Sequence, residues 1–183
     1  MKGIEFICAG GNCRSVMARE VARKRAREIA ADIPIYSSGV LVDEFFSVGP
    51  YPRVVAALKS MGIEGEPVEL TKKFIEMESK QRNEALKIRK YDAVENHIPQ
   101  QTDLKKDIDL VLVVADKEKK ALLEKFPEAK AKTITEYTSS SYQEMDAVSL
   151  QDWLTNVKYQ LQYLDGLIKV MPSLIDRYIC EFH

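Results

Sequence analysis

The chain has 183 residues, of which 45% are hydrophobic and 30% charged, enough apolar sequence for the buried core of one globular domain. Its formal net charge of -1 provides no overall attraction to nucleic acid or to an anionic membrane. Three cysteines form no disulfide framework, and neither a secretory signal nor eighteen consecutive apolar residues is present. The sequence therefore predicts one domain over residues 1–183, in the reducing cytoplasm, with neither nucleic acid nor a membrane as partner.

Segments with strand patterns and segments with helix patterns alternate along the chain. Predicted strands cover residues 3–8, 33–37, 108–114 and 131–136, and the third is the most apolar, as expected for a central strand. Predicted helices cover residues 15–31, 51–61, 71–91, 117–126 and 150–170, with a short helix after Pro172. This alternation predicts an α/β fold with a parallel sheet and helices on both faces, whose ligands bind beyond the carboxyl ends of the strands.

A short loop with reactive residues at both ends joins the first predicted strand to the first predicted helix. It reads Cys8-Ala9-Gly10-Gly11-Asn12-Cys13-Arg14-Ser15. Backbone N–H groups at a helix N-terminus attract anions, and glycines accept the positive φ angles that a tight, concave turn needs. Residues 9–15 are therefore predicted to bind a phosphate group, with Cys8 beneath it.

The same loop has the side chains for nucleophilic attack on phosphorus. The positive end of the helix dipole favours the thiolate form of Cys8, and the Arg14 guanidinium offers a planar fork to two phosphate oxygens. The Ser15 hydroxyl either caps the helix or donates to the thiolate. A plainer interpretation makes Cys8 a buried strand-end cysteine, Arg14 a solvated side chain and Ser15 only an N-cap. The joint occurrence of a strand, glycines, Arg-Ser and a helix favours a catalytic site over this structural interpretation.

Two other kinds of site fit this loop poorly. A nucleotide-binding P-loop would end in Gly-Lys, which is missing, and Cys8 with Cys13 supplies too few ligands for a structural zinc. Cys180, His97 and His183 show no metal-ligand spacing. We therefore predict neither a metal nor a cofactor.

The loop and the start of the following helix resemble the low-molecular-weight protein tyrosine phosphatases. The signature of that family reads Cys-x-Gly-Asn-x-Cys-Arg-Ser before a Met-Ala-Glu-type helix, and the residues in register are Cys8, Gly10, Cys13, Arg14, Ser15, Met17 and Ala18. The resemblance implies a flavodoxin-like three-layer sandwich with strand order 2-1-3-4. It also implies Cys8 as nucleophile, Arg14 as phosphate clamp, Ser15 as thiolate partner, and Cys13 as a neighbour able to form a protective disulfide with Cys8.

Two features that support the loop in that family differ in this chain. Where the family has Asn after the first Gly, the chain has Gly11, and Asn12 follows one position later. Where the family has a His-x-Ala-Arg motif, residues 66–71 contain neither His nor Arg. Because both differ together, we expect another hydrogen-bond network to hold the loop, with Gly11 and Asn12 as the positions that differ.

Two further segments follow the first loop. Residues 37–39 and 45–50 fit the Ser-x-Gly segment and aromatic loop of the family, which implies Phe45 or Phe46 as a pocket wall, although both could be core residues. Ser37 or Ser38 could support the phosphate loop from the second strand. Residues 75–106 depart from the family and look like a helical insertion, either a solvated helix face or a lid or partner site.

Phosphoryl transfer also requires a general acid, because the leaving oxygen must be protonated. The family uses the Asp of an Asp-Pro-aromatic motif, and the matching residue is Asp146, followed here by Ala147 and Val148. The plainer interpretation of Asp146 is a loop or cap carboxylate. Asp116 and Glu144 are the reserve candidates.

These observations predict a phosphomonoester hydrolase of the low-molecular-weight tyrosine phosphatase type, acting through a phosphocysteine intermediate on a phosphorylated protein or small phosphomonoester. One alternative is a thiol-dependent arsenate reductase, which needs a resolving cysteine pair and finds only Cys13 and Cys180. Another is a phosphate- or phosphopeptide-binding module with weak catalysis. The family also contains protein-arginine phosphatases, and Asn12 occupies the loop position associated with that choice. The sequence predicts no oligomeric state.

Overall fold

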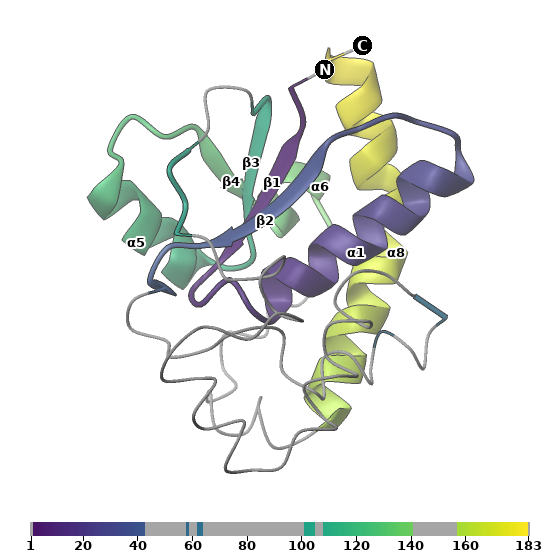
Figure 1. Ribbon diagram of the computed structural model, residues 1–183, viewed down its shortest axis with the longest axis horizontal. Coiled ribbons are helices and arrows are strands. Elements are labelled where there is room, and N and C mark those ends of the chain that lie inside the picture. Colours follow the sequence, from purple (N-terminus) through teal and green to yellow (C-terminus); the bar gives the residue numbers. More distant parts are fainter. Residues whose placement is uncertain are drawn as a thin grey trace, which may run out of the picture.

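The described part of the computed structural model comprises residues 2–42, 58, 62–63, 101–104, 108–140 and 157–182. Within it, four parallel strands form one sheet in the order β2-β1-β3-β4 (Figure 1). The strands are β1 (Ile4–Cys8), β2 (Ile35–Gly39), β3 (Leu110–Val113) and β4 (Ala131–Thr133). The helices are α1 (Arg14–Glu28), α5 (Asp116–Lys125), α6 (Ile134–Thr138) and α8 (Val157–Phe182). The α/β class and the strand order 2-1-3-4 predicted from the sequence are confirmed.

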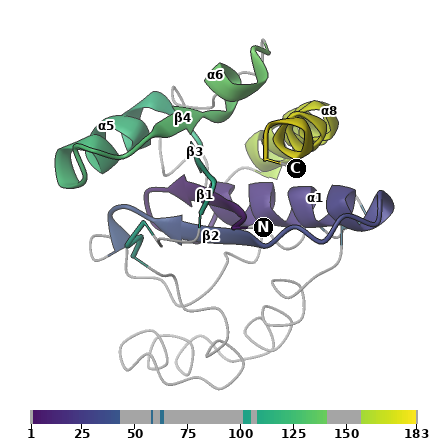
Figure 2. The ribbon, with the colours of Figure 1, turned by 90° about the horizontal axis from the view of Figure 1, so that it is seen from above.

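Side chains alternate across the sheet, so each face builds its own core. On one face Ile4 and Phe6 of β1 pack in a large apolar cluster with residues of α1, α6 and α8. On the other face Ile7 packs with Val113 and with Leu122 of α5. In Figure 2, α1 and α8 lie on one side of the strands and α5 on the other. The molecule therefore has the three layers that the resemblance implies.

The fourth strand is shorter than predicted because a helix begins inside the expected range. The Thr133 hydroxyl accepts a hydrogen bond from the Glu136 backbone N–H at 3.1 Å, and a Glu136 carboxylate oxygen accepts one from the Thr133 N–H at 2.7 Å. This capping box starts α6 directly after Thr133, so the prediction of a strand over residues 134–136 is wrong. The Lys119 side chain and the Thr133 N–H also lower the pKa of Glu136 by hydrogen bonding its carboxylate.

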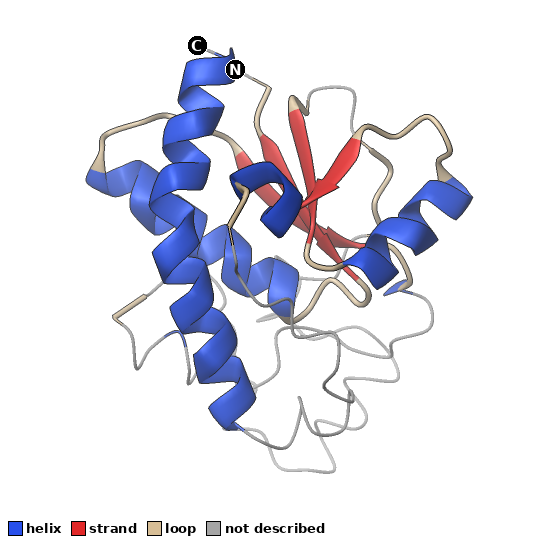
Figure 3. Cartoon of the chain, turned by 180° about the vertical axis from the view of Figure 1, so that it is seen from behind, coloured by secondary structure: helices blue, strands red, loops and turns tan. Residues whose placement is uncertain are grey.

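Helix α8 continues through Pro172, where the sequence predicted a break and a short second helix. Buried apolar side chains keep helical spacing on both sides of the proline, with Leu167 and Met171 before or beside it and Leu174 and Tyr178 after it. The stabilisation from packing these side chains outweighs the cost of the helical hydrogen bond that is lost because proline has no N–H. In Figure 3, the short α6 lies in front of the strands and the long α8 runs beside them.

The two ends of the described chain meet at one end of the sheet. A carboxylate oxygen of Asp109 accepts hydrogen bonds from the Lys2 backbone N–H and from the Tyr178 hydroxyl, each at 3.0 Å, and the Gly3 N–H donates to the Tyr178 oxygen at 3.2 Å. Burial opposes ionisation of Asp109, but the hydrogen bonds from Lys2, Tyr178 and Gly3 outweigh it and lower its pKa. Burial and the bond to Asp109 raise the pKa of Tyr178 to about 12.

Other predictions differ in smaller ways. Helix α1 begins at Arg14 and ends at Glu28, against a predicted range of 15–31, and α5 is shifted by one residue from its predicted range. Of the predicted helix over residues 51–61 the structure describes only Leu58, which is helical, and the predicted helix over residues 71–91 lies outside the described residues. No helix in the ranges that the structure describes is long and apolar enough to cross a membrane.

Candidate active site

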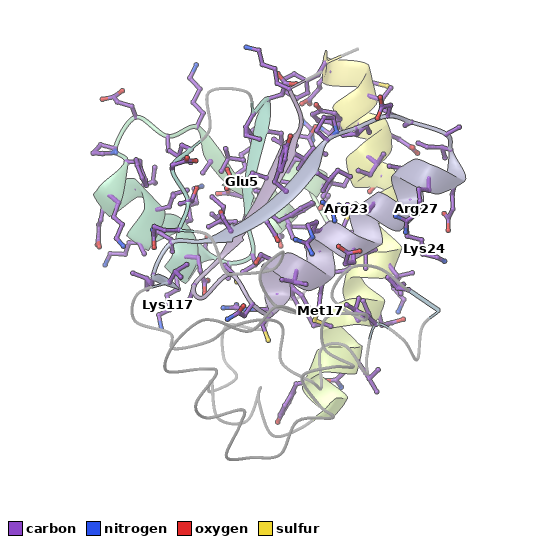
Figure 4. The ribbon with its side chains drawn as sticks, viewed as in Figure 1. Glu5, Met17, Arg23, Lys24, Arg27 and Lys117 are labelled. Atoms are coloured by element: carbon purple, nitrogen blue, oxygen red, sulfur yellow. The ribbon has the colours of Figure 1, made fainter. Side chains whose placement is uncertain are left out.

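The predicted phosphate loop lies at the carboxyl end of β1, between that strand and the first turn of α1. The chain after β2 supports it from one side, because the Val40 N–H donates to the Cys8 carbonyl and the Leu41 N–H to the Ala9 carbonyl, each at 2.9 Å. Figure 4 shows Met17, near the start of α1, and Lys117, at the start of α5, at the same end of the sheet. Two helix N-termini therefore lie near the loop, as expected for a ligand site in a parallel α/β sheet.

The Cys8 thiol is buried and has two hydrogen-bonding neighbours within the loop. Its residue is only 3% exposed, its sulfur lies 3.0 Å from the Ser15 hydroxyl oxygen, and it accepts a hydrogen bond from the Gly11 N–H at 3.2 Å. The N-cap residue of α1 is Cys13, which makes no side-chain capping bond. Of the two roles predicted for Ser15, the structure therefore places its hydroxyl at the sulfur and not at the helix cap.

The two loop glycines behave differently. Gly11 has a φ of 67°, the left-handed conformation that favours glycine, whereas Gly10 has no positive φ. This conformation directs the Gly11 N–H toward the sulfur of Cys8. Of the two glycines, only Gly11 therefore takes the positive φ that was expected for the concave turn.

Gly39, at the end of β2, is a site residue that the sequence analysis did not single out. A Cβ at this position would lie 2.6 Å from both the Ala9 carbonyl oxygen and the Gly11 nitrogen. Its signal was the Ser-x-Gly segment, which we interpreted through its serines. Ser38 instead donates to buried Glu5 of β1, and Ser37 accepts from Arg19 of α1 at 3.0 Å, so these two hydroxyls bond to the strand and the helix. The loop is held from β2 by close backbone packing.

The Arg14 guanidinium bonds to the carboxylate of Glu118, through Nη2 and Oε1. Glu118 lies in the first turn of α5 and is 3% exposed, while the Arg14 side chain is 18% exposed. The charged sequence of α5 is typical of a solvated helix, so sequence analysis did not single out Glu118. By contrast Asp116, the reserve acid two positions earlier, is exposed.

Asn12 is buried without hydrogen bonds from its side chain. The residue is 2% exposed, and neither its amide oxygen nor its amide nitrogen has a partner. The expected new network around Gly11 and Asn12 therefore gains no bond from the Asn12 side chain. Gly11 contributes a bond through its N–H, which donates to the Cys8 sulfur.

Several predicted site residues lie outside the described residues, namely Phe45, Phe46, Glu144 and Asp146. Of residues 75–106, the structure describes only 101–104. There the Gln101 side chain donates to the Val40 carbonyl at 2.9 Å and accepts from the Val42 N–H at 3.1 Å, and the Thr102 N–H donates to the Gly39 carbonyl at 2.8 Å. This short segment therefore supports the chain that packs on the phosphate loop.

Cys8, Cys13 and Cys180 form no disulfide in this structure. Among the described residues, no group of three or more His, Cys, Asp or Glu side chains is placed to hold a metal ion. The groups gathered at the loop are a thiol, a hydroxyl, backbone N–H groups and a guanidinium. This set suits a tetrahedral oxyanion.

Comparisons with known proteins agree with this geometry. Residues 3–78 match the family model described as low molecular weight phosphotyrosine protein phosphatase. A search of curated proteins gives no match.

The fold is similar to that of several solved structures. A low molecular weight phosphotyrosine phosphatase from Vibrio cholerae aligns with a TM-score of 0.72 and 14% identity, covering 99% of each chain. A low molecular weight protein tyrosine phosphatase from Bacillus subtilis aligns with a TM-score of 0.67 and 20% identity, again covering 99% of each chain. A mutant of the YwlE arginine phosphatase, with a phosphorylated active-site serine, aligns with a TM-score of 0.70 and 19% identity over 98% of this chain and 97% of that one.

At these identities the solved structures establish the fold, while the family match rests on the segment that contains the phosphate loop. Both agree with the resemblance seen in the sequence. Residues 3–78, fewer than half of the chain, are thus similar to the low molecular weight phosphotyrosine protein phosphatase family, and the fold is similar to that of solved phosphatases described in the same terms.

Proposed function

We propose that the protein hydrolyses phosphomonoesters through a phosphocysteine intermediate, with Cys8 as the nucleophile. The observation that carries the proposal is the surrounding of the Cys8 sulfur, which lies at the base of the loop with the Gly11 N–H at 3.2 Å and the Ser15 hydroxyl at 3.0 Å. A cysteine sulfur in this position is placed to attack a phosphorus atom held by the loop. Arg14 lies at the first position of α1, where it supplies a guanidinium to the same anion site.

The reaction has two steps. In the first, the Cys8 sulfur attacks phosphorus in line, so that a P–S bond forms while the P–O bond to the leaving group breaks. Arg14 and the loop N–H groups stabilise the charge on the equatorial oxygens. In the second, a water oxygen attacks phosphorus, the P–S bond breaks, and phosphate leaves with the thiolate restored. Ser15 stabilises the departing thiolate in this step.

We propose Asp146 as the general acid that protonates the leaving oxygen and then as the base that takes a proton from the water. The support is its position in the sequence, before the last long helix. Removing this carboxyl with Asp146→Ala should slow hydrolysis most for esters with poor leaving groups. Equal rates for Asp146→Ala and the wild type across a series of aryl phosphates would move the role to Asp116 or Glu144.

The finer proposal for the substrate is phosphotyrosine in a protein. The family description supports it, whereas the arginine phosphatase among the similar folds supports phosphoarginine as the second candidate. Turnover of a phosphotyrosine peptide and a phosphoarginine peptide of the same sequence separates the two. We further propose that residues 1–183 act as one domain, in the cytoplasm, where free thiols such as that of Cys8 persist.

Cys8→Ser tests the proposal directly. It should abolish turnover of a small aryl phosphate and leave binding of inorganic phosphate partly intact, because the loop N–H groups and Arg14 remain. Cys180→Ser is the matched control, since that thiol is exposed in α8 and should leave turnover unchanged. Full activity in Cys8→Ser would contradict the mechanism, and phosphate binding without turnover by the wild type would favour a binding module.

A further inference from the structure

We propose that Glu118 positions Arg14 for phosphate binding, so that the geometry of the phosphate clamp depends on a carboxylate from a distant part of the chain. This inference rests on the proposed function and deepens it. Glu118 is a positioning residue and not a catalytic one, because it acts through the Arg14 guanidinium. The two residues are 104 positions apart, and only the fold brings them together.

The contact is charged and buried on the Glu118 side. Glu118 is 3% exposed, its Oε1 accepts a hydrogen bond from Arg14 Nη2, and its Oε2 is buried without a hydrogen-bond partner. A carboxylate in such a place is costly unless a cation lies against it. Arg14 is the cation that the structure places there.

Stability alone does not account for this arrangement. An apolar side chain of similar size would fill the same volume without a desolvated charge, and buried ion pairs stabilise folds poorly for that reason. The ion pair is better suited to fixing the orientation of the Arg14 guanidinium. It ties the mobile end of a long side chain to α5, a helix that packs on the sheet through Leu122.

A carboxylate on one edge of the guanidinium is compatible with phosphate on another. Arg carries five N–H donors in a planar fork, and the bond to Glu118 uses a donor on Nη2. The bond to Glu118 sets the orientation of the guanidinium plane and restricts the rotamers of the Arg14 side chain. Groups held in advance stabilise a transition state more than a ground state, because no further ordering is needed during reaction.

Glu118 also has an effect that opposes phosphate binding, because a carboxylate near the site repels the anion. The two effects have opposite signs in a binding measurement. If orientation dominates, removing Glu118 weakens oxyanion binding, and if repulsion dominates, removing it strengthens binding. The buried ion pair favours orientation, since the charge of Glu118 is balanced by Arg14 before any ligand binds.

The test compares inorganic phosphate with vanadate as inhibitors of aryl phosphate turnover. Vanadate adopts a trigonal bipyramidal geometry on a thiolate and resembles the transition state, whereas phosphate resembles the product. We expect Glu118→Ala to weaken vanadate binding about tenfold or more and phosphate binding about threefold or less. Glu118→Gln keeps an acceptor for Arg14 and should show an intermediate loss. Glu124→Gln, an exposed position on the same helix, is the matched control and should match the wild type.

The outcomes separate a positioning role of Glu118 from a general effect on the fold. A larger loss for vanadate than for phosphate in Glu118→Ala, with partial recovery in Glu118→Gln, supports positioning. Unchanged or tighter binding of both ions overturns it, and so does an equal weakening of both, which indicates a general effect on the fold. Thermal unfolding of each variant accompanies the measurement. A wild type without turnover or phosphate binding would count against the proposed function, whereas an active wild type with an unchanged Glu118→Ala would count against this inference alone.

Discussion

A single methyl group at Gly39 should disturb the phosphate loop more than the stability of the fold. In Gly39→Ala the added Cβ would lie 2.6 Å from the Ala9 carbonyl oxygen and 2.6 Å from the Gly11 nitrogen, about 0.8 Å inside the 3.4 Å at which ordinary van der Waals contact begins. The third neighbour at 2.6 Å is a side-chain methyl of Val42, which has more freedom to turn away. The backbone of the loop therefore has to move.

The strand cannot yield as easily as the loop. Gly39 pairs with Cys8 in the parallel ladder, and its carbonyl accepts the Thr102 N–H at 2.8 Å. Overpacking of this kind costs about 1–3 kcal/mol of folding free energy. The same displacement moves the Gly11 N–H relative to the Cys8 sulfur, and a misplacement of about 1 Å at a reacting centre costs on the order of 100-fold in rate.

The assay is steady-state turnover of a small aryl phosphate, together with urea unfolding. We expect a fall in kcat of on the order of 100-fold at a temperature where the variant remains folded. Gly62→Ala provides the control, because Gly62 has a φ of 65° and open space around its Cβ position, so it should lose about 1–2 kcal/mol of stability from strain while keeping its turnover. Turnover of folded Gly39→Ala within twofold of the wild type would refute the argument that this contact positions the loop.

Three further predictions follow from the same contacts. Ser15→Ala removes the hydroxyl 3.0 Å from the Cys8 sulfur and should lower kcat about 10- to 100-fold, the equivalent of one hydrogen bond to a charged group, and an unchanged kcat would exclude that role. Arg14→Ala leaves the Glu118 carboxylate buried and should cost about 3–5 kcal/mol in urea unfolding, of which a second substitution, Glu118→Leu, should recover most; additive losses would contradict this coupling. Because the folded-state pKa values of Asp109 and Glu136 are lowered, their contribution to stability is present above their ordinary values of 3.8 and 4.5 and is lost as the pH falls below them; equal unfolding free energies at pH 3.5 and 6 would contradict it.

Local sequence patterns were sufficient for much of the fold. The apolar runs around Phe6 and Leu112 predicted the two central strands, and the alternation of strands and helices predicted the parallel sheet. Errors occurred where a local signal competed with a second signal or with packing. At Thr133 a capping box ended a strand that hydrophobicity alone would extend, and at Pro172 the buried face of α8 outweighed a helix-breaking residue.

For the candidate site, the sequence by itself determined the residues of the loop. Cys8, Gly11 and Ser15 lie within eight positions, so a turn between a strand and a helix suffices to bring the sulfur, the N–H and the hydroxyl together. Only the tertiary structure decided what holds that loop and its arginine. Gly39 and Glu118 reach the site through strand pairing and helix packing. The Ser-x-Gly segment drew attention to Gly39 only through a resemblance, and a glutamate in a charged helix carries no local sign that it will meet an arginine so far away in the chain.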